Sequence, residues 1–176
     1  MENRMTEATL LSYGDQPVLR FERFLPKPIE DVWRAVTDPA QMRAWFPTRI
    51  EIDRWEAGAV LTHHFDGQAR EPLPGTVLEC SAPHRLRFTW GDDTITFELL
   101  PASGGTTFVL SEQVGAERAA RNAAGWEICL ERLVQGPAGE DWSARFDRYN
   151  AAFEPLLGVQ ERSPASTHSR SRNRTS

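Results

Sequence analysis

The segment AAGWEICLERL, residues 123–133, decides the fold of this 176-residue chain. Its apolar side chains belong to a stripe that recurs at steps of four, three, four and three residues: Ala119, Ala123, Trp126, Leu130 and Leu133. This spacing matches the 3.6-residue period of a helix with one apolar face. It predicts an amphipathic helix over residues 116–134.

Gly125 lies inside this predicted helix, where glycine costs about 1 kcal/mol relative to alanine. That cost indicates a use for the missing side chain, such as close approach by a strand or a ligand; the alternative is a tolerated glycine without a particular role, as in many helices. The opposite, solvent-facing side of the helix carries the charged residues 121, 127, 131 and 132. Ile128 lies in the middle of that side, where it is either exposed or covered by a following helix.

Before this helix, residues 48–113 follow a period of two. In RLRFTW, residues 85–90, the apolar Leu86, Phe88 and Trp90 alternate with polar residues, which is typical of an antiparallel strand with one wet face. Similar runs predict six consecutive strands, at residues 49–54, 60–66, 75–80, 85–90, 94–100 and 106–113. Turn signals separate these predicted strands, and one of the turn signals is at residues 72–75.

The N-terminal part predicts two extended segments around a Gly14–Asp15 turn, within residues 8–25. Two short helices follow. The first begins at Pro28, and the second has Asp38 as its N-cap with Pro39 as its first residue.

Length and composition favour one domain over residues 1–158. It ends in an extra helix at about residues 140–154 with an aromatic stripe, Trp142, Phe146, Tyr149 and Phe153. Residues 159–176 are expected to form a disordered basic tail. The net charge is −5, and basic residues gather only in that tail, so nucleic-acid binding is not expected.

No apolar run is long enough to cross a bilayer, and the N-terminus does not resemble a signal peptide. The expected location is therefore cytoplasmic, without membrane association. Cys80 and Cys129 lie far apart and are expected to be small buried thiols rather than zinc ligands. His63 and His64 are adjacent in a strand and point to opposite faces, so they cannot hold one metal ion. No metal and no cofactor are expected.

Four stretches resemble a known family: RFLPKPIEDVWRAVTDPAQMRAWF (23–46), GTVLECSAPHRLRFTW (75–90), TTFVLSEQ (106–113) and GWEICLERL (125–133). The chain is similar, over roughly residues 19–134, to bacterial proteins like the C-terminal domain of the activator of heat-shock-protein-90 ATPase, in the START-like (SRPBCC) superfamily. The resemblance implies an α+β helix-grip (Bet v 1-like) fold. In that fold a curved seven-stranded antiparallel sheet wraps around a long C-terminal helix, with two short helices after the first strand. It also implies an apolar cavity that admits a small hydrophobic ligand.

The candidate ligand-binding residues are those expected to face this cavity: Trp45, Phe46, His63, Phe65, Phe88, Trp90, Phe97, Glu112, Trp126 and Leu130. Trp126 is expected to face Trp90. The alternative is that the aromatic residues only fill the core. His63 either meets a ligand or is a satisfied core histidine, and His64 forms an exposed pair on the other face.

Glu112 stands where relatives often carry histidine. It either points inward with a raised pKa or turns out to solvent. Arg23, on the apolar side of its strand, either anchors an anionic ligand or serves structurally, by snorkelling or in an ion pair.

No nucleophile elbow, phosphate-binding glycine loop or Cys-His signature is present. The sequence therefore favours binding of a small hydrophobic or aromatic molecule without a covalent step, by a monomer or weak homodimer. One alternative is an enzyme of the polyketide cyclase or dehydratase kind, with His63 or Glu112 as acid-base group. Another is a protein-binding, co-chaperone-like or stress-response module. Fold alone does not choose among them.

Overall fold

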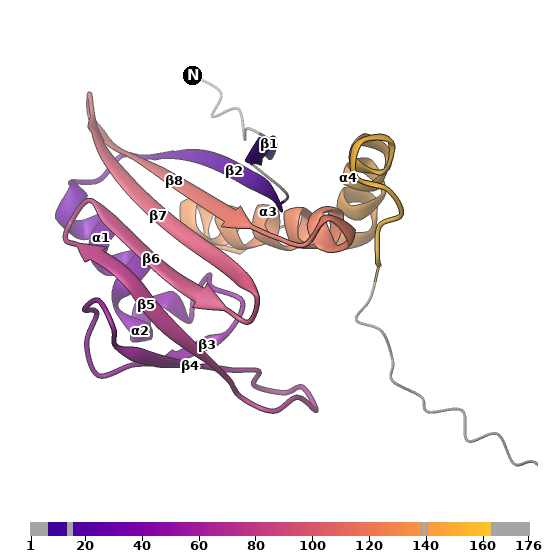
Figure 1. Ribbon diagram of the computed structural model, residues 1–176. Helices are drawn as coiled ribbons and strands as arrows, with labels where there is room; N and C mark the ends of the chain where they lie inside the picture. The colour runs from indigo at the N-terminus through magenta and orange to yellow at the C-terminus, as the bar shows by residue number, and fades with distance from the viewer. Residues whose placement is uncertain (1–6, 14–15, 138, 140, 163–176) are drawn as a thin grey trace, which may run out of the picture.

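The computed structural model describes residues 7–13, 16–137, 139 and 141–162. Its strands form one open antiparallel sheet of eight strands, in the order β1-β2-β8-β7-β6-β5-β4-β3 (Figure 1). They are β1 (Thr9–Tyr13), β2 (Gln16–Leu25), β3 (Arg49–Glu51), β4 (Val60–His64), β5 (Leu73–Ser81), β6 (Arg85–Trp90), β7 (Asp93–Ala102) and β8 (Gly105–Gln113). The helices are α1 (Ile29–Thr37), α2 (Pro39–Met42), a 3-10 turn η1 (Ala116–Arg118), α3 (Ala119–Gln135) and α4 (Trp142–Leu157).

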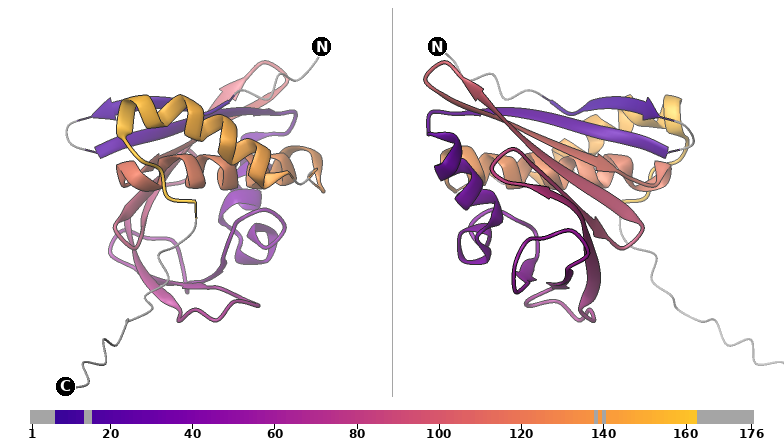
Figure 2. Two further views of the ribbon diagram at one scale, coloured as in Figure 1. Left: turned by 90° about the vertical axis from the view of Figure 1, so that its right-hand side faces the viewer. Right: turned by 60° about the vertical axis from the view of Figure 1, so that its left-hand side comes forward.

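The predicted helix-grip arrangement is confirmed. Helix α3 lies along one face of the curved sheet, and α4 lies against α3 (Figure 2). The sheet has eight strands where the resemblance implies seven. The additional strand is β1, which pairs with β2 at one edge. The predicted turn at Gly14–Asp15 lies outside the described residues.

The alternation of β2 shows how the sheet receives α3. Leu19, Phe21 and Leu25 are buried on the side that packs against the helix, as their period-two spacing predicts. Between β5 and β6 the register shifts at Val77 and Glu79, and such an irregularity bends a sheet. The predicted turn at residues 72–75 is wrong, because β5 begins at Leu73, where it pairs with His63 of β4.

The two short helices position the aromatic residues that follow them. Asp38 caps α2 as predicted, with its carboxylate accepting a hydrogen bond from the Ala40 backbone N–H at 3.0 Å. Helix α2 ends at Met42, and Trp45 and Phe46 follow in a turn. The Trp45 indole N–H donates to the Ala35 carbonyl at 3.0 Å, which fixes its ring in the core.

A close-packed aromatic cluster fills one end of the space between sheet and helices. The Trp45 ring centroid lies 5.8 Å from that of Phe97 and 6.1 Å from that of Phe108. Phe46 and Phe88 extend the cluster, with 6.1 Å between their ring centroids. These spacings are those of aromatic rings in contact, so this end of the molecule is a packed core.

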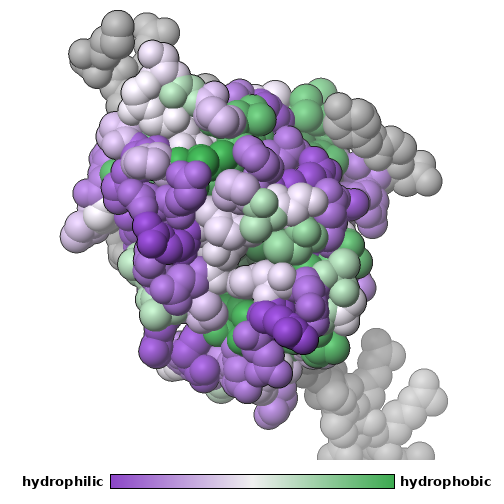
Figure 3. All heavy atoms as spheres, turned by 90° about the vertical axis from the view of Figure 1, so that its left-hand side faces the viewer, coloured by the Kyte–Doolittle hydropathy of each residue, from purple (hydrophilic) through white to green (hydrophobic). Residues whose placement is uncertain are grey.

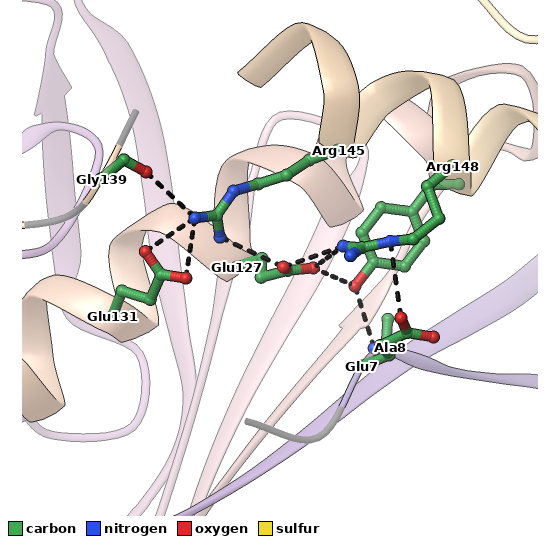
Figure 4. Close-up of polar contacts among 8 residues, drawn as sticks. Glu7, Ala8, Glu127, Glu131, Gly139, Arg145 and Arg148 are labelled. Atoms are coloured by element: carbon green, nitrogen blue, oxygen red, sulfur yellow. Dashed lines mark hydrogen bonds and ion pairs between the residues drawn. The ribbon is translucent and has the colours of Figure 1, made fainter. Parts of the chain in front are cut away.

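The outer face of α3 is buried by α4 instead of facing solvent. Glu127, expected on the wet side, is 8% exposed, and its carboxylate accepts hydrogen bonds from Arg145, Arg148 and Tyr149 of α4 (Figure 4). Ile128 is buried as well. Because α4 lies against this face, the charges there are partners in a buried network rather than a solvated surface.

Helix α4 continues past Pro155 to Leu157, further than the sequence predicts, because a proline in the last turn removes only one helical hydrogen bond. Gln160 belongs to the stretch expected to be disordered, yet its side chain is buried. It accepts from the Ala120 N–H at 2.9 Å and donates to the Ala116 carbonyl at 2.8 Å. It thereby satisfies a backbone donor in the first turn of α3. Residues 163–176 of the predicted tail lie outside the described residues.

The surface is mixed in character. On the side at the left of Figure 1, apolar side chains gather in small separate areas among hydrophilic ones (Figure 3). Exposed large apolar residues include Phe24, Val60 and Leu100, and single residues of this kind are usual on soluble proteins. In the described part of the chain, no helix is long and apolar enough to cross a membrane.

Candidate functional site

A cavity of about 360 Å³ lies between the inner face of α3 and the turn that joins β6 to β7. It is bounded by aromatic, aliphatic and charged side chains together: Pro47, Arg70, Leu73, Trp90, Gly91, Asp92, Asp93, Glu112, Arg118, Arg121, Asn122, Gly125, Trp126 and Cys129. The expected cavity is apolar, whereas this one has a strongly polar rim.

The aromatic wall of the cavity consists of Trp90 and Trp126. Their ring centroids lie 6.2 Å apart and their planes are perpendicular, so the predicted facing of these two residues is confirmed. Beside Trp126, a Cβ atom built on Gly125 would meet nothing within 4 Å. Close approach of a strand is therefore not the reason for this glycine, which leaves open space in the cavity wall.

Glu112 of β8 points into the cavity and is 2% exposed, so the alternative in which it turns to solvent is wrong. One carboxyl oxygen accepts a hydrogen bond from the Trp126 indole N–H at 2.8 Å, and the other accepts from the Asn122 amide at 3.1 Å. Burial, with a smaller contribution from the charge of Asp93, raises the pKa of Glu112 to about 8. At neutral pH this group is mostly a neutral carboxylic acid.

A second buried carboxylate, Asp93, lies at the start of β7. It accepts a hydrogen bond from Arg118 at 2.7 Å and a longer one from Asn122 at 3.5 Å. Burial raises the pKa of Asp93, while the charge of Arg118 acts in the opposite direction. Asp93 thus has Arg118 as an ion-pair partner, whereas within the part of the chain that the structure describes no cation pairs with Glu112.

Comparison with known proteins gives the family. The family model for activator of Hsp90 ATPase homolog 1-like protein matches residues 26–136. The chain belongs to this family. The match ends before α4, so the helix that buries the outer face of α3 lies beyond the part that defines the family. A search of curated proteins returned no match.

Solved structures similar to this family member share its fold. A conserved protein of unknown function from Enterococcus faecalis is 21% identical, with a TM-score of 0.74, covering 88% of this chain and 94% of that one. CalU16 from Micromonospora echinospora is 20% identical, with a TM-score of 0.63, covering 86% and 94%. A protein from Rhodobacter sphaeroides is 24% identical, with a TM-score of 0.58, covering 72% and 95%. At these identities the likeness is one of fold.

Among the predicted ligand-binding residues, the structure brings Trp90, Glu112 and Trp126 together around the cavity. The others are buried outside its lining: Trp45, Phe46, His63, Phe65, Phe88, Phe97 and Leu130. Apart from Trp45 and Phe46, which lie in the turn after α2, period-two and helical spacing place these residues on the inner side correctly. They do not show which part of the interior is filled by neighbouring rings.

His63 is a satisfied core histidine. It is fully buried, its ring stacks on Trp90 with centroids 5.0 Å apart, and burial lowers its pKa. Its Nε2 lies 3.1 Å from the Thr89 carbonyl and must donate to it, while Nδ1 lies 3.1 Å from the Thr48 hydroxyl. A side chain on Gly75 would come within 2.5 Å of the same Thr89 carbonyl, so glycine is required at that position.

The other polar candidates have structural partners. His64 pairs with Glu51 across the strands at 2.8 Å. Asp66 pairs instead with Arg49, also at 2.8 Å. Arg23 is 3% exposed and lies outside the cavity lining; it donates to the Glu22 carbonyl, and burial lowers its pKa. It therefore does not anchor a ligand in this cavity.

Sequence reasoning missed the polar rim of the cavity, formed by Arg70, Asp92, Asp93, Arg118, Arg121 and Asn122. The expectation that Arg121 lies on the solvent-facing side of the helix is wrong, because its position beside Gly125 and Asn122 brings it into the cavity wall. One signal was present, since residues 118, 122, 125 and 129 recur at helical spacing beside the apolar stripe. Cys129 lies in this row, and burial raises the pKa of its thiol to about 12. Among the described residues, no group of three or more His, Cys, Asp or Glu side chains could hold a metal ion.

Proposed function

We propose that this protein binds a small aromatic molecule in the cavity between α3 and the β6–β7 turn. The observation that carries the proposal is the open space at Gly125, next to the perpendicular rings of Trp90 and Trp126. Asn122, Trp126 and Cys129 surround Gly125 on the helix and all line the cavity, so a side chain at 125 would project into it. A leucine there would fill space that a ligand occupies.

The size and the lining both suit such a ligand. A volume of about 360 Å³ falls within the range of small-molecule sites, which bury most of the ligand surface. The two indole rings provide apolar surface, and Asn122 and Glu112 provide a few fixed polar groups that orient a guest. At the other end of the interior, rings of the protein itself fill the equivalent space.

The test is a calorimetric titration with 2-naphthoate, a two-ring aromatic probe, on the wild type, Gly125→Leu and Gly125→Ala. We expect Gly125→Leu to lose binding and Gly125→Ala to retain it within about 3-fold, because a methyl group leaves most of the volume free. An unchanged affinity in Gly125→Leu, or no binding to the wild type, would contradict the proposal. Thermal melting of each variant without probe checks that all three are folded.

A second candidate function, acid–base catalysis on a bound molecule, is favoured by Glu112. A carboxyl group whose pKa lies at about 8, inside a cavity, can give up or take a proton near neutral pH. His63 does not qualify, because both ring nitrogens have partners outside the cavity lining. A substrate that is turned over by the wild type but only bound by Glu112→Gln would establish catalysis. Equal turnover by both would exclude Glu112 as the acid–base group.

A further inference from the structure

Two arginines of the cavity wall, Arg70 and Arg121, have no carboxylate partner within the described residues, and of the two only Arg121 has a buried guanidinium nitrogen, since Arg70 is exposed to solvent. The Nη1 atom of Arg121 is buried without a hydrogen-bond partner, and its side chain makes no hydrogen bond or ion pair within residues 7–13, 16–137, 139 and 141–162. Burial lowers the pKa of Arg121, and the nearby charge of Arg118 lowers it further. Removing a guanidinium group from water without a partner is costly, so a missing partner is expected.

The groups that face Arg121 do not neutralise it. Arg118 and Arg70 carry the same charge as Arg121. Asp93 is already engaged by Arg118 at 2.7 Å, and Glu161 is exposed to solvent. Glu112 is held by two neutral donors and is mostly protonated at pH 7. With Glu112 neutral, the charged groups that line the cavity are three arginines and two aspartates, Asp92 and Asp93. The lining therefore has a net positive charge.

Other arginines near α3 are paired. Arg145 donates to Glu127 at 3.1 Å and to Glu131 at 2.7 Å, and Arg148 donates to Glu127 at 2.6 Å (Figure 4). Arg118 has Asp93. Arg121 lines the cavity as Arg118 does, but within the described residues it has no carboxylate partner.

We infer that the molecule bound in this cavity is an aromatic carboxylate, or an aromatic anion of similar size, whose charged group pairs with Arg121. The inference rests on the proposed function. The aromatic part lies against Trp90 and Trp126, and the anionic group is directed toward Arg121 on the N-terminal side of Gly125. A guanidinium group binds a carboxylate through two parallel N–H···O bonds, which fixes the orientation of the ring system.

The test compares 2-naphthoate with 2-naphthamide, which has the same rings and no charge, by calorimetry at pH 7. We expect the wild type to bind 2-naphthoate about 10-fold more tightly, since a charge-assisted hydrogen bond contributes about that much. Arg121→Gln removes this preference and leaves the affinity for 2-naphthamide unchanged within about 2-fold. Retained binding of 2-naphthamide also shows that the variant is folded and its cavity intact.

Arg87→Gln is the matched control. Arg87 lies on β6, the strand that carries Trp90, but outside the cavity lining. Arg87→Gln removes the same net charge from the protein as Arg121→Gln, but not from the cavity. It should leave the preference for 2-naphthoate unchanged. Equal affinities of the wild type for the two probes, or a preference that survives in Arg121→Gln, would overturn the inference while leaving the proposed function in place. Failure of both probes to bind would overturn the proposed function and this inference with it.

Discussion

The two faces of α3 are both buried, but they treat charge in opposite ways. On the outer face, Glu127 accepts hydrogen bonds from Arg145, Arg148 and Tyr149, so each charge has a partner within the protein. On the inner face, the carboxyl of Glu112 is held by the neutral donors of Trp126 and Asn122. Within the described residues, no carboxylate pairs with Arg121 on that inner face.

This difference distinguishes the structural network on the outer face from the proposed binding site on the inner face. A buried charge without a counter-ion lowers stability, and charged groups in such unfavourable surroundings are concentrated at functional sites. The outer face joins α4 to α3 and is complete as it stands. The inner face has open space, aromatic walls and an arginine without a carboxylate partner in the described residues, and these features support the proposed binding of a small molecule there.

The largest effect is expected on the outer face. Glu127→Gln leaves Arg145 and Arg148 without their shared carboxylate, and breaking a buried ion pair from one side costs about 3 kcal/mol. Urea unfolding followed by circular dichroism measures the loss. Asp147→Asn removes the partner of Arg162 in an exposed pair and should cost less than about 1 kcal/mol. Equal losses in the two variants would mean that the outer network does not hold α4 in place.

The next effect is a pH dependence on the inner face. The pKa of Glu112 is raised from 4.5 to about 8, so between these values the folded state binds more protons than the unfolded state. The contribution of Glu112 to the free energy of unfolding is therefore fully present below pH 4.5 and is lost as the pH rises from 4.5 to about 8. The stability of the wild type relative to Glu112→Gln should fall by up to about 1.4 kcal/mol per pH unit between pH 5.5 and 8.

Glu112→Gln is a suitable comparison because its amide has nearly the same shape, and the Asn122 amide can rotate to present its oxygen to the new NH2 group. Other titrating groups, such as His63, are common to both proteins and cancel in the difference. A difference in unfolding free energy that stays constant over this pH range would show that Glu112 is ionised in the folded state.

The smallest effect is a gain. Gly125→Ala should raise the free energy of unfolding by up to about 1 kcal/mol, because alanine favours the helix and its methyl group meets nothing within 4 Å. Chemical denaturation measures this gain. A loss of stability instead would mean that the space beside Gly125 is already filled in solution.

The period of the sequence predicts most of the fold. Alternation in residues 48–113 and the stripe around Trp126 give the sheet, the long helix and their inner faces, and the family resemblance supplies the topology. Glu127 shows one limit, since a charged residue on a polar helix side looks solvated until a later helix such as α4 is placed over it. Gln160 is a similar case, because its partners, Ala116 and Ala120, lie far away in sequence.

The candidate site could be predicted only in part, for a related reason. Trp90, Glu112 and Trp126 follow from alternation and helical spacing, because each points inward from its own element. Whether a ring fills space or borders it depends on its neighbours, and Phe97 and Trp45 contact each other in three dimensions only. Arg121 and Asp93 line the same cavity because the start of β7 meets the beginning of α3, where Asp93 accepts hydrogen bonds from Arg118 and Asn122, and local sequence does not encode this contact.

The most direct test compares two indole N–H groups by NMR during a titration with 2-naphthoate. The Trp126 N–H donates to Glu112 in the cavity, whereas the Trp45 N–H donates to the Ala35 carbonyl in the filled core. We expect the Trp126 resonance, assigned with Trp126→Phe, to shift as the probe saturates the protein, while the Trp45 resonance stays in place. Saturable binding that leaves Trp126 unmoved, or that moves Trp45 as much as Trp126, would contradict binding in this cavity.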